Sequence, residues 1–348
     1  MTTWYCTREQ VKAALDVADT ARADAQIDRL IEASSRGIEA ASRANRVFRP
    51  YLGTEVFDWP ARNQGGPYRL WIDRAAELIT PTAIVSAGST VDLSTVRLYP
   101  RQGPPYGRVE LDRSLGTPWG TAATAQASIS ITGWWGYRDD EAVAGELAAT
   151  LDATTTRVDV TDSAAVGVGD FLRLDDERLQ VVGKRMLDTG QTLADAIPGT
   201  KAETALTVGD GDTFAVGEVL LVDAERMLIV DIAGDTLIAR RAWDGSVLAG
   251  HTAGATIYAA RTLVVDRGQA GTTAATHSAA AQVWRHEVPG PIEELCIGET
   301  LVALGREQSG YARVIGAGDA VRGAPGGDIR DLRETVRSRY RRYRSGAI

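Results

Sequence analysis

Two acidic pairs in this sequence have the residue types of an acid–base catalyst. Asp175 and Glu177 recur as Asp223 and Glu225, at the same place in two copies of one pattern. Two carboxylates that flank a glycosidic bond would make a glycan hydrolase. A duplicated Asp-x-Glu-Arg segment at a strand end is more simply a solvated hairpin, because short motif matches are frequently accidental. We therefore predict no catalytic residues here.

The histidines are the next candidates. His251 and His277 also occupy equivalent positions in the repeat, and His286 is the third histidine. A metal site would need them to converge with a further ligand. Because the repeat places His251 and His277 in different units, we expect each to stabilise a turn. The segment GDGDTFAVG (209–217) resembles a calcium loop but lacks the acidic residue that closes an EF-hand loop. We predict no metal, no cofactor and no enzyme activity.

The repeats predict which elements position these side chains. Segments 168–182 and 216–230 are identical at seven of fifteen positions, and 236–258 matches 262–284 at an offset of 26 residues. Both copies of the first half of the repeat therefore precede both copies of its second half. A simple tandem repeat would alternate the two halves, so this order indicates one unit nested within a loop of another.

Each nested unit has the residue pattern of a small β structure. We place the inner unit at 202–260 and the two halves of the outer unit at 154–198 and 261–285. Apolar and polar residues alternate around Gly and Asp turns, which predicts a small barrel or sandwich for each unit. A short β-solenoid is the alternative, but two copies are too few for a stable one.

Helices and further strands frame the repeats. Thr7 and Gln10 fit a capping box before the first helix. A second helix opens near Asp24 and ends before Pro50, because the residue ahead of a proline avoids the helical region. Short β-branched and aromatic segments separated by Pro and Gly predict antiparallel strands over 51–135. The second helix carries an apolar stripe at helical spacing: Ile27, Leu30, Ile31 and Ile38.

Connecting segments follow. Residues 137–153 are polar and Ala-rich, which predicts a bridge into the repeats. After the repeats, Pro291 marks the first turn of another helix. Residues 312–327 are rich in glycine and contain a proline, which predicts a flexible linker.

The final segment predicts a helix over 328–344 with two parallel stripes. The apolar residues are spaced 3, 4, 4, 3, and the arginines repeat that spacing one residue further on. A helix this short is marginal alone and must dock on something. It could pack on its own subunit with a solvated basic face, or it could dock on another chain. The apolar stripe is Ile329, Leu332, Val336, Tyr340 and Tyr343, and the basic stripe is Arg330, Arg333, Arg337, Arg341 and Arg344.

Bulk properties limit the function classes. A chain of 348 residues predicts two or three domains. A formal net charge of −8 argues against a protein that binds DNA phosphates over its whole surface, although DNA could slide past it. Two cysteines, Cys6 and Cys296, make no disulfide framework. The sequence has no signal-peptide pattern and no apolar run long enough for a membrane span, so we expect a soluble protein made in a cytoplasm.

With 139–285 set aside, the remaining chain reads TREQVKAAL and DAQIDRLIEASSRGIE near the start, RLYPRQGPPYGRVELD and ITGWWGY in the middle, and VPGPIEELCIGETLVAL after the repeats. In these segments it resembles the head-tail connector (adaptor, or head-completion) proteins of long-tailed bacteriophages. The resemblance covers about 200 of the 348 residues. The repeats, with VDRGQAGTTAATHSAAA, look like small β modules of phage virion proteins. The nested insertion departs from the family pattern.

The resemblance implies a structural protein of the virion neck, assembled in the host cytoplasm. Its family forms a ring, commonly of twelve subunits, that docks under the portal, contacts a tail-side neck or stopper protein, and lets DNA pass without specific binding. It implies no enzyme activity and no membrane contact, and it favours the portal as the partner of the C-terminal helix.

The predicted fold class is α+β: a helical connector core with a β-rich middle segment, plus an inserted all-β region of two nested units. The predicted divisions are 1–138 with 286–311 (connector core), 154–198 with 261–285 (outer unit), 202–260 (inner unit), 312–327 (linker) and 328–348 (C-terminal arm).

Two other functions compete with the connector. The first is a phage adhesin or carbohydrate-binding protein that uses the repeated β units. The second is a glycan hydrolase that uses the Asp/Glu pairs. Helices at both ends of the chain, with an arginine-striped tail, favour the connector because an adhesin has no need of them.

Overall fold

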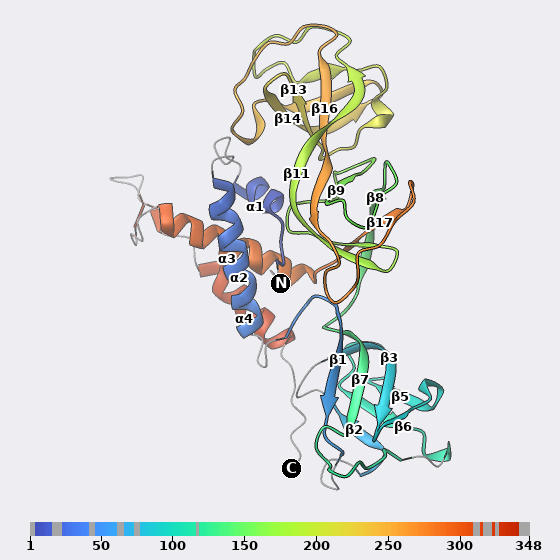
Figure 1. Ribbon diagram of the computed structural model, residues 1–348. Coiled ribbons are helices and arrows are strands. Elements are labelled where there is room, and N and C mark those ends of the chain that lie inside the picture. Colours follow the sequence, from blue (N-terminus) through green and yellow to red (C-terminus); the bar gives the residue numbers. More distant parts are fainter. Residues whose placement is uncertain are drawn as a thin grey trace.

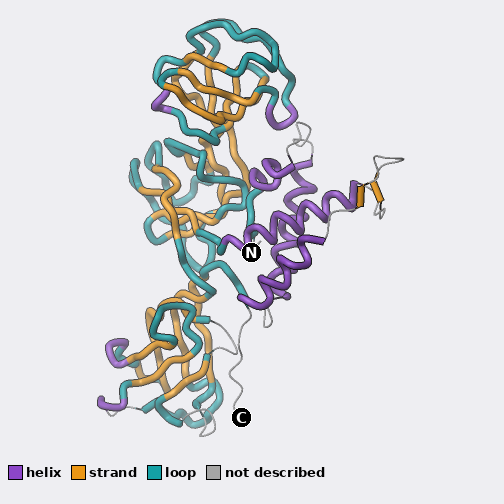
Figure 2. Tube along the Cα trace, turned by 180° about the vertical axis from the view of Figure 1, so that it is seen from behind, coloured by secondary structure: helices purple, strands orange, loops and turns teal. Residues whose placement is uncertain are grey.

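Three β modules lie end to end, with a group of helices beside them (Figures 1 and 2). The computed structural model describes residues 4–15, 23–41, 46–60, 66–72, 77–115, 118–308, 314–315, 322–323 and 327–340. The fold is α+β with antiparallel strands, as predicted. No helix in these described ranges is long and apolar enough to cross a membrane.

The helices form one core from both ends of the chain. They are α1 (Arg8–Leu15), α2 (Asp24–Ala41), α3 (Gly290–Gln308) and α4 (Gly327–Arg339). The predicted capping box is confirmed: the Thr7 amide donates to the Gln10 side chain (2.7 Å), and the Gln10 amide donates to the Thr7 hydroxyl (3.1 Å). The predicted stripe of α2 is also confirmed, since all four of its residues are buried against α3.

The module at 51–135 consists of two antiparallel sheets around one core. Its most buried large side chains include Trp119 and Trp135. One sheet has the order β1-β7-β3-β4 and the other β2-β6-β5. Their bounds are β1 (Tyr51–Phe57), β2 (Arg69–Trp71), β3 (Leu78–Ser86), β4 (Ser89–Thr90), β5 (Val96–Tyr99), β6 (Arg108–Leu111) and β7 (Ile129–Trp135). The antiparallel strands predicted for this segment are confirmed.

The other two modules share one ten-stranded sheet. Figure 1 shows that two long strands, β11 and β16, run through both of them. The strands are β8 (Glu141–Glu146), β9 (Arg157–Asp159), β10 (Phe171–Leu174), β11 (Glu177–Thr192), β12 (Ala205–Thr207), β13 (Val219–Val222), β14 (Glu225–Ala233), β15 (Thr236–Arg240), β16 (Thr256–Asp266) and β17 (Gln282–His286).

The two modules have the same strand order. The outer module reads β9-β16-β11-β10-β17-β8, and the inner one reads β12-β15-β14-β13-β16-β11. Each has its own apolar core. The edges of each sheet meet: the Ala148 amide donates to the Asp159 carbonyl in the outer module, and the Ala194 amide donates to the Thr207 carbonyl in the inner one. Each module is therefore a small closed β unit.

The strand register locates the insertion point of the inner module. In the inner module, Ala233 pairs with Thr236 across the tight turn Gly234–Asp235. The equivalent pair in the outer module is Arg185 and Thr262. The outer module has no tight turn there; its two strands continue as β11 and β16 into the inner module. The inner module, 186–261, thus occupies the position of a hairpin turn.

These bounds differ from the predicted ones in two places. Residues 137–153 are not a bridge, because they include β8 and the buried Leu147 and Leu151 of the outer core. Leu193 and Ile197 were assigned to the outer unit but pack in the inner core. Leu147 is equivalent to Leu193, and Leu151 to Ile197, at an offset of 46 residues, whereas the strands that follow are equivalent at an offset of 48. The difference arises because the segment between Ile197 and β12 is two residues longer than the segment between Leu151 and β9. That change of offset hid the first part of the repeat.

The ends of the whole insertion lie side by side. Glu141 and His286 are paired in the β8–β17 ladder. Just outside them, Tyr137 and Val288 both pack on the helical core. The segment predicted as a flexible linker, 312–327, contains one antiparallel pairing between β18 (Val314–Ile315) and β19 (Arg322–Gly323); its other residues before Gly327 lie outside the described ones.

Candidate functional site

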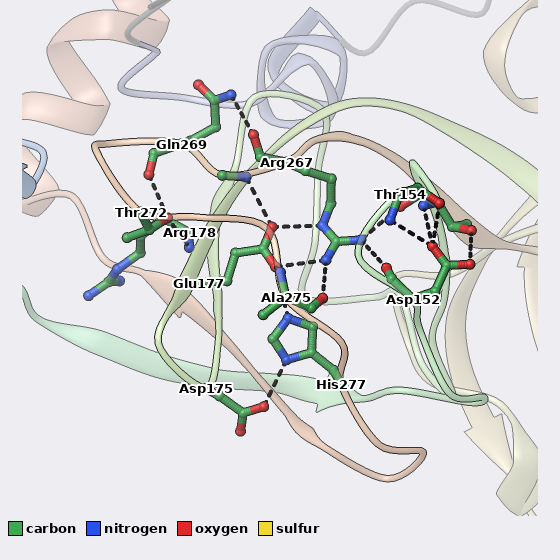
Figure 3. Close-up of polar contacts among 12 residues, drawn as sticks. Asp152, Thr154, Asp175, Glu177, Arg178, Arg267, Gln269, Thr272, Ala275 and His277 are labelled. Atoms are coloured by element: carbon green, nitrogen blue, oxygen red, sulfur yellow. Dashed lines mark hydrogen bonds and ion pairs between the residues drawn. The ribbon is translucent and has the colours of Figure 1, made fainter.

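The duplicated Asp-x-Glu pair lies in a buried polar cluster of the outer module (Figure 3). The Glu177 side chain is fully buried at the start of β11. Arg267, just after β16, donates to both of its oxygens at 2.7 Å. The amides of Gly268 and Ala275 also donate to them, each at 3.0 Å. The carboxylate therefore accepts four hydrogen bonds before the histidine is counted.

His277 completes the cluster. Its Nε2 is 2.9 Å from Glu177 Oε2, and its Nδ1 is 2.7 Å from Asp175 Oδ2. The ring therefore bridges the buried carboxylate of Glu177 and the carboxylate of Asp175. The Asp175 side chain is 67% exposed, whereas the other two members are buried. The turn residue Asp175 also has a positive φ of 47°, a conformation that aspartate tolerates better than most residues.

The arginine of the cluster joins segments that are distant in the sequence. Arg267 donates to the carbonyls of Asp152 and Thr155, both at 2.8 Å, and to that of Ala275 at 2.7 Å. One guanidinium and one carboxylate therefore hold together two loop segments, 152–155 and 275–277, and two strand ends, at Glu177 and Arg267.

The inner module repeats the cluster residue by residue. Arg241 donates to both Glu225 oxygens at 2.8 Å, and His251 lies 2.9 Å from Glu225 and 2.7 Å from Asp223. Arg241 also donates to the carbonyls of Pro198, Glu203 and Ala249. The amides of Ala242 and Ala249 donate to Glu225 at 2.8 and 3.0 Å.

The hydrogen bonds of the clusters keep their two glutamates ionised. Burial by itself would raise the pKa of Glu177 and Glu225, but the hydrogen bonds from arginine, histidine and backbone amides outweigh it and lower both pKa values to about 2. Such a carboxylate stays ionised and has no free acceptor site for a substrate. The prediction of a solvated hairpin is right for the exposed Asp175 and Asp223 and wrong for the two glutamates, which are fully buried.

The histidines do not converge. His251 and His277 belong to separate modules, and each lies in a short β-bridge and contacts the aspartate of a hairpin turn, which agrees with the predicted role in stabilising a turn. His286 lies elsewhere, with its Nε2 3.0 Å from the Phe48 carbonyl, and burial lowers its pKa to about 4. Within the described ranges, no group of His, Cys, Asp and Glu side chains is arranged to hold a metal ion.

Sequence reasoning missed Arg241 and Arg267. Both were visible as identical residues of the 236–258/262–284 match, at an offset of 26. A buried glutamate needs a cationic partner, and an arginine at equivalent positions in both copies was the signal that could have identified it.

A cavity of about 610 Å³ lies between the outer module and the 51–135 module. One wall carries Asp175, Asp176 and His277 of the cluster, and the facing wall carries Thr132 and Trp134 of β7. The inner copy of the cluster does not line this cavity. The two copies therefore differ in their surroundings rather than in their own geometry.

The C-terminal helix α4 corrects the docking hypothesis. Val336 and Tyr340 are buried in the helical core, and Ile329 and Leu332 pack against it. Phe48 and Tyr137 both stack edge-on against Tyr340, with ring centroids 5.8 and 5.6 Å apart. These four residues of the predicted stripe thus pack, fully or in part, against their own subunit.

The arginines of α4 face outward. Arg330, Arg333 and Arg337 are exposed, and Arg333 pairs with Glu299 of α3 at 2.7 Å. Arg341, Tyr343 and Arg344 lie outside the described residues, as does the predicted end of the helix at 344; the described helix ends at Arg339.

No family model, no curated protein and no solved structure matches this chain.

Proposed function

We propose that this protein is a structural component of a phage neck: a head-tail connector that forms a ring below the portal and lets DNA pass. The proposal rests first on the resemblance of the frame, which lies on both sides of the insertion. The observation that supports it best is that Tyr137 and Val288, at the two ends of the insertion, pack in one helical core. Removing the β units would leave a continuous frame.

The two nested β units would then project from the ring rather than build it. They continue the line of modules that starts at residues 51–135 and passes beside the helices, with the inner module at the far end (Figures 1 and 2). Glu177 and Glu225 serve internal ion pairs, which suits a scaffold better than a catalyst. Arg330 and Arg337 on the outer face of α4 would meet acidic groups of the portal, while the apolar stripe holds α4 in place.

The mass of the purified protein in solution is the direct test. A closed ring of many subunits, commonly twelve in the family, supports a connector, and negative-stain images should show a central channel. Addition of the ring to DNA-filled heads that lack it should restore tail attachment. A monomer or a trimer at all concentrations, with no binding to such heads, would contradict the proposal.

The cavity beside the outer cluster favours glycan binding as a second candidate. Its volume lies within the range of ligand sites, and it combines Trp134 with carboxylate and hydroxyl side chains. An adhesin would quench its tryptophan fluorescence with a defined oligosaccharide, and Trp134→Ala should remove that response. A monomeric or trimeric protein with such a response would favour the adhesin over the connector.

A further inference from the structure

The only two cysteines of the sequence meet in the folded protein. Cys6 precedes α1 and Cys296 lies in α3, 290 positions later, yet their sulfur atoms are 3.1 Å apart. Both thiols are buried, at 4% and 0% exposure. A chain with two cysteines has no need to place them side by side for packing, since either would fit an apolar core alone.

A cavity gives small molecules access to one of the two. It measures about 280 Å³, and Cys6 lines it together with Trp4, Arg49, His286 and Glu293. Cys296 does not line it and lies behind Cys6. A small oxidant in the cavity would therefore meet the Cys6 sulfur first.

The surroundings of Cys296 suit a resolving thiol. Hydrogen bonding from the Cys6 thiol lowers the pKa of Cys296, and the Ser35 hydroxyl, 3.4 Å away, acts in the same direction against burial. The same hydrogen bond, together with burial, raises the pKa of Cys6, so the shared proton lies on Cys6. The thiolate is the nucleophilic form of cysteine, so this sulfur is prepared to attack a neighbour.

We propose that Cys6 and Cys296 form a reversible disulfide when hydrogen peroxide enters this cavity. Cys296 accepts the Cys6 proton as the Cys6 sulfur attacks one peroxide oxygen, the O–O bond breaks, and the leaving hydroxide takes a solvent proton as water. Cys6 is then a sulfenic acid. The Cys296 sulfur attacks the Cys6 sulfur, the S–O bond breaks, and the second hydroxide leaves as water with the Cys296 proton. Two thiols are oxidised by two electrons, and one peroxide is reduced to two waters.

The disulfide would fasten the junction between the helices and the β units. The residues around Cys6 hold that junction: the Arg8 amide donates to the Val168 carbonyl at 3.0 Å, and Glu9 accepts from the Val168 amide at 2.7 Å. Next to them, the Trp4 ring covers Gly169, where an added Cβ would lie 2.3 Å from the ring. A covalent link from Cys6 to α3 therefore fixes the segment from Trp4 to Glu9, which contacts the outer module. This effect does not depend on the function of the protein.

The test begins with the full-length wild-type protein, reduced and then exposed to hydrogen peroxide under native conditions. After quenching, free thiols are alkylated in denaturant and the peptides are mapped by mass spectrometry. We expect a loss of two hydrogen atoms, a cross-linked peptide pair that contains Cys6 and Cys296, and full reversal by dithiothreitol. The oxidised protein should also show a higher Tm than the reduced one.

Single variants test the order of the steps. In Cys296→Ser, peroxide should leave a sulfenic acid on Cys6 that dimedone labels, because the resolving thiol is gone. In Cys6→Ser, Cys296 should stay unlabelled under the same exposure. Labelling in the reverse order would overturn the assigned roles. Two free thiols after peroxide treatment of the wild-type protein, or only links between different chains, would overturn the proposal without any variant.

Discussion

Arg267→Ala should open the outer β module and leave the inner one folded. The substitution removes the guanidinium that donates to both Glu177 oxygens at 2.7 Å, and Glu177 is fully buried while Arg267 is 7% exposed. Removing one partner of a buried pair leaves an uncompensated charge and costs about 3–5 kcal/mol. Since a domain is typically stable by about 5–15 kcal/mol, this loss should dominate the behaviour of the module.

Hydrogen–deuterium exchange with mass spectrometry can follow each module separately. In Arg267→Ala, the amides of β10 and β17 should lose protection by the equivalent of about 3–5 kcal/mol, while those of β13 and β15 should keep it. Arg241→Ala is the matched variant, since Arg241 makes the same contacts in the inner module. It should reverse the pattern.

Arg157→Ala is the control. Arg157 is an exposed residue of β9 in the same outer module, and its loss should change stability by no more than about 0.5 kcal/mol. If Arg267→Ala behaves like Arg157→Ala, the reasoning from the buried cluster is refuted, and water or local rearrangement must compensate the charge of Glu177.

Three further predictions follow from the same geometry. Glu177 and Glu225 have folded-state pKa values of about 2, below the ordinary value of 4.5. Their contribution to the stability of the folded protein is therefore complete above about pH 4.5 and is lost as the pH falls towards 2. The Tm should drop over that range, and it should drop less steeply in the double variant Glu177→Gln/Glu225→Gln. Residues 186–261 can be replaced by Gly-Asp, the turn that closes the inner hairpin, and circular dichroism and hydrogen–deuterium exchange should then show a soluble protein with an intact outer module. Deleting 202–260 instead should cause aggregation, because it exposes Leu193 and Ile197. Leu332→Asp/Val336→Asp should lower the Tm of the isolated protein by displacing α4, whereas Arg330→Glu/Arg337→Glu should leave Tm nearly unchanged and weaken binding to portal-bearing heads mainly at low salt. An unchanged Tm in Leu332→Asp/Val336→Asp would show that the apolar stripe does not hold α4 on the helical core.

Local patterns predicted the elements well. The capping box at Thr7 and Gln10, the buried stripe of α2, the strands of 51–135 and the helix that begins near Pro291 all depend on residues close together in the sequence. The internal repeat also predicted that two β units exist, because the copies kept identical residues at constant offsets. These features follow from spacing alone.

The bounds of the units needed the strand register. The offset between the copies changes from 46 to 48 after Ile197, so sequence comparison placed Leu193 and Ile197 in the wrong module. Only the pairing of Arg185 with Thr262, equivalent to Ala233 with Thr236, shows that the inner module replaces a turn. Register is a property of two strands that lie far apart in the sequence, and a single strand does not contain it.

The sequence by itself determined the residue types of the clusters, their duplication and the amphipathic character of the last helix. The tertiary structure decided what those residues do. It buried Glu177 and Glu225 against arginines, brought Cys6 to Cys296, and covered the apolar stripe of α4 with its own core. The physical reason is the same in each case: an acid, a thiol or an apolar stripe gains its role from the group that faces it, and segments as far apart in the chain as Phe48 and Tyr340 supply that group.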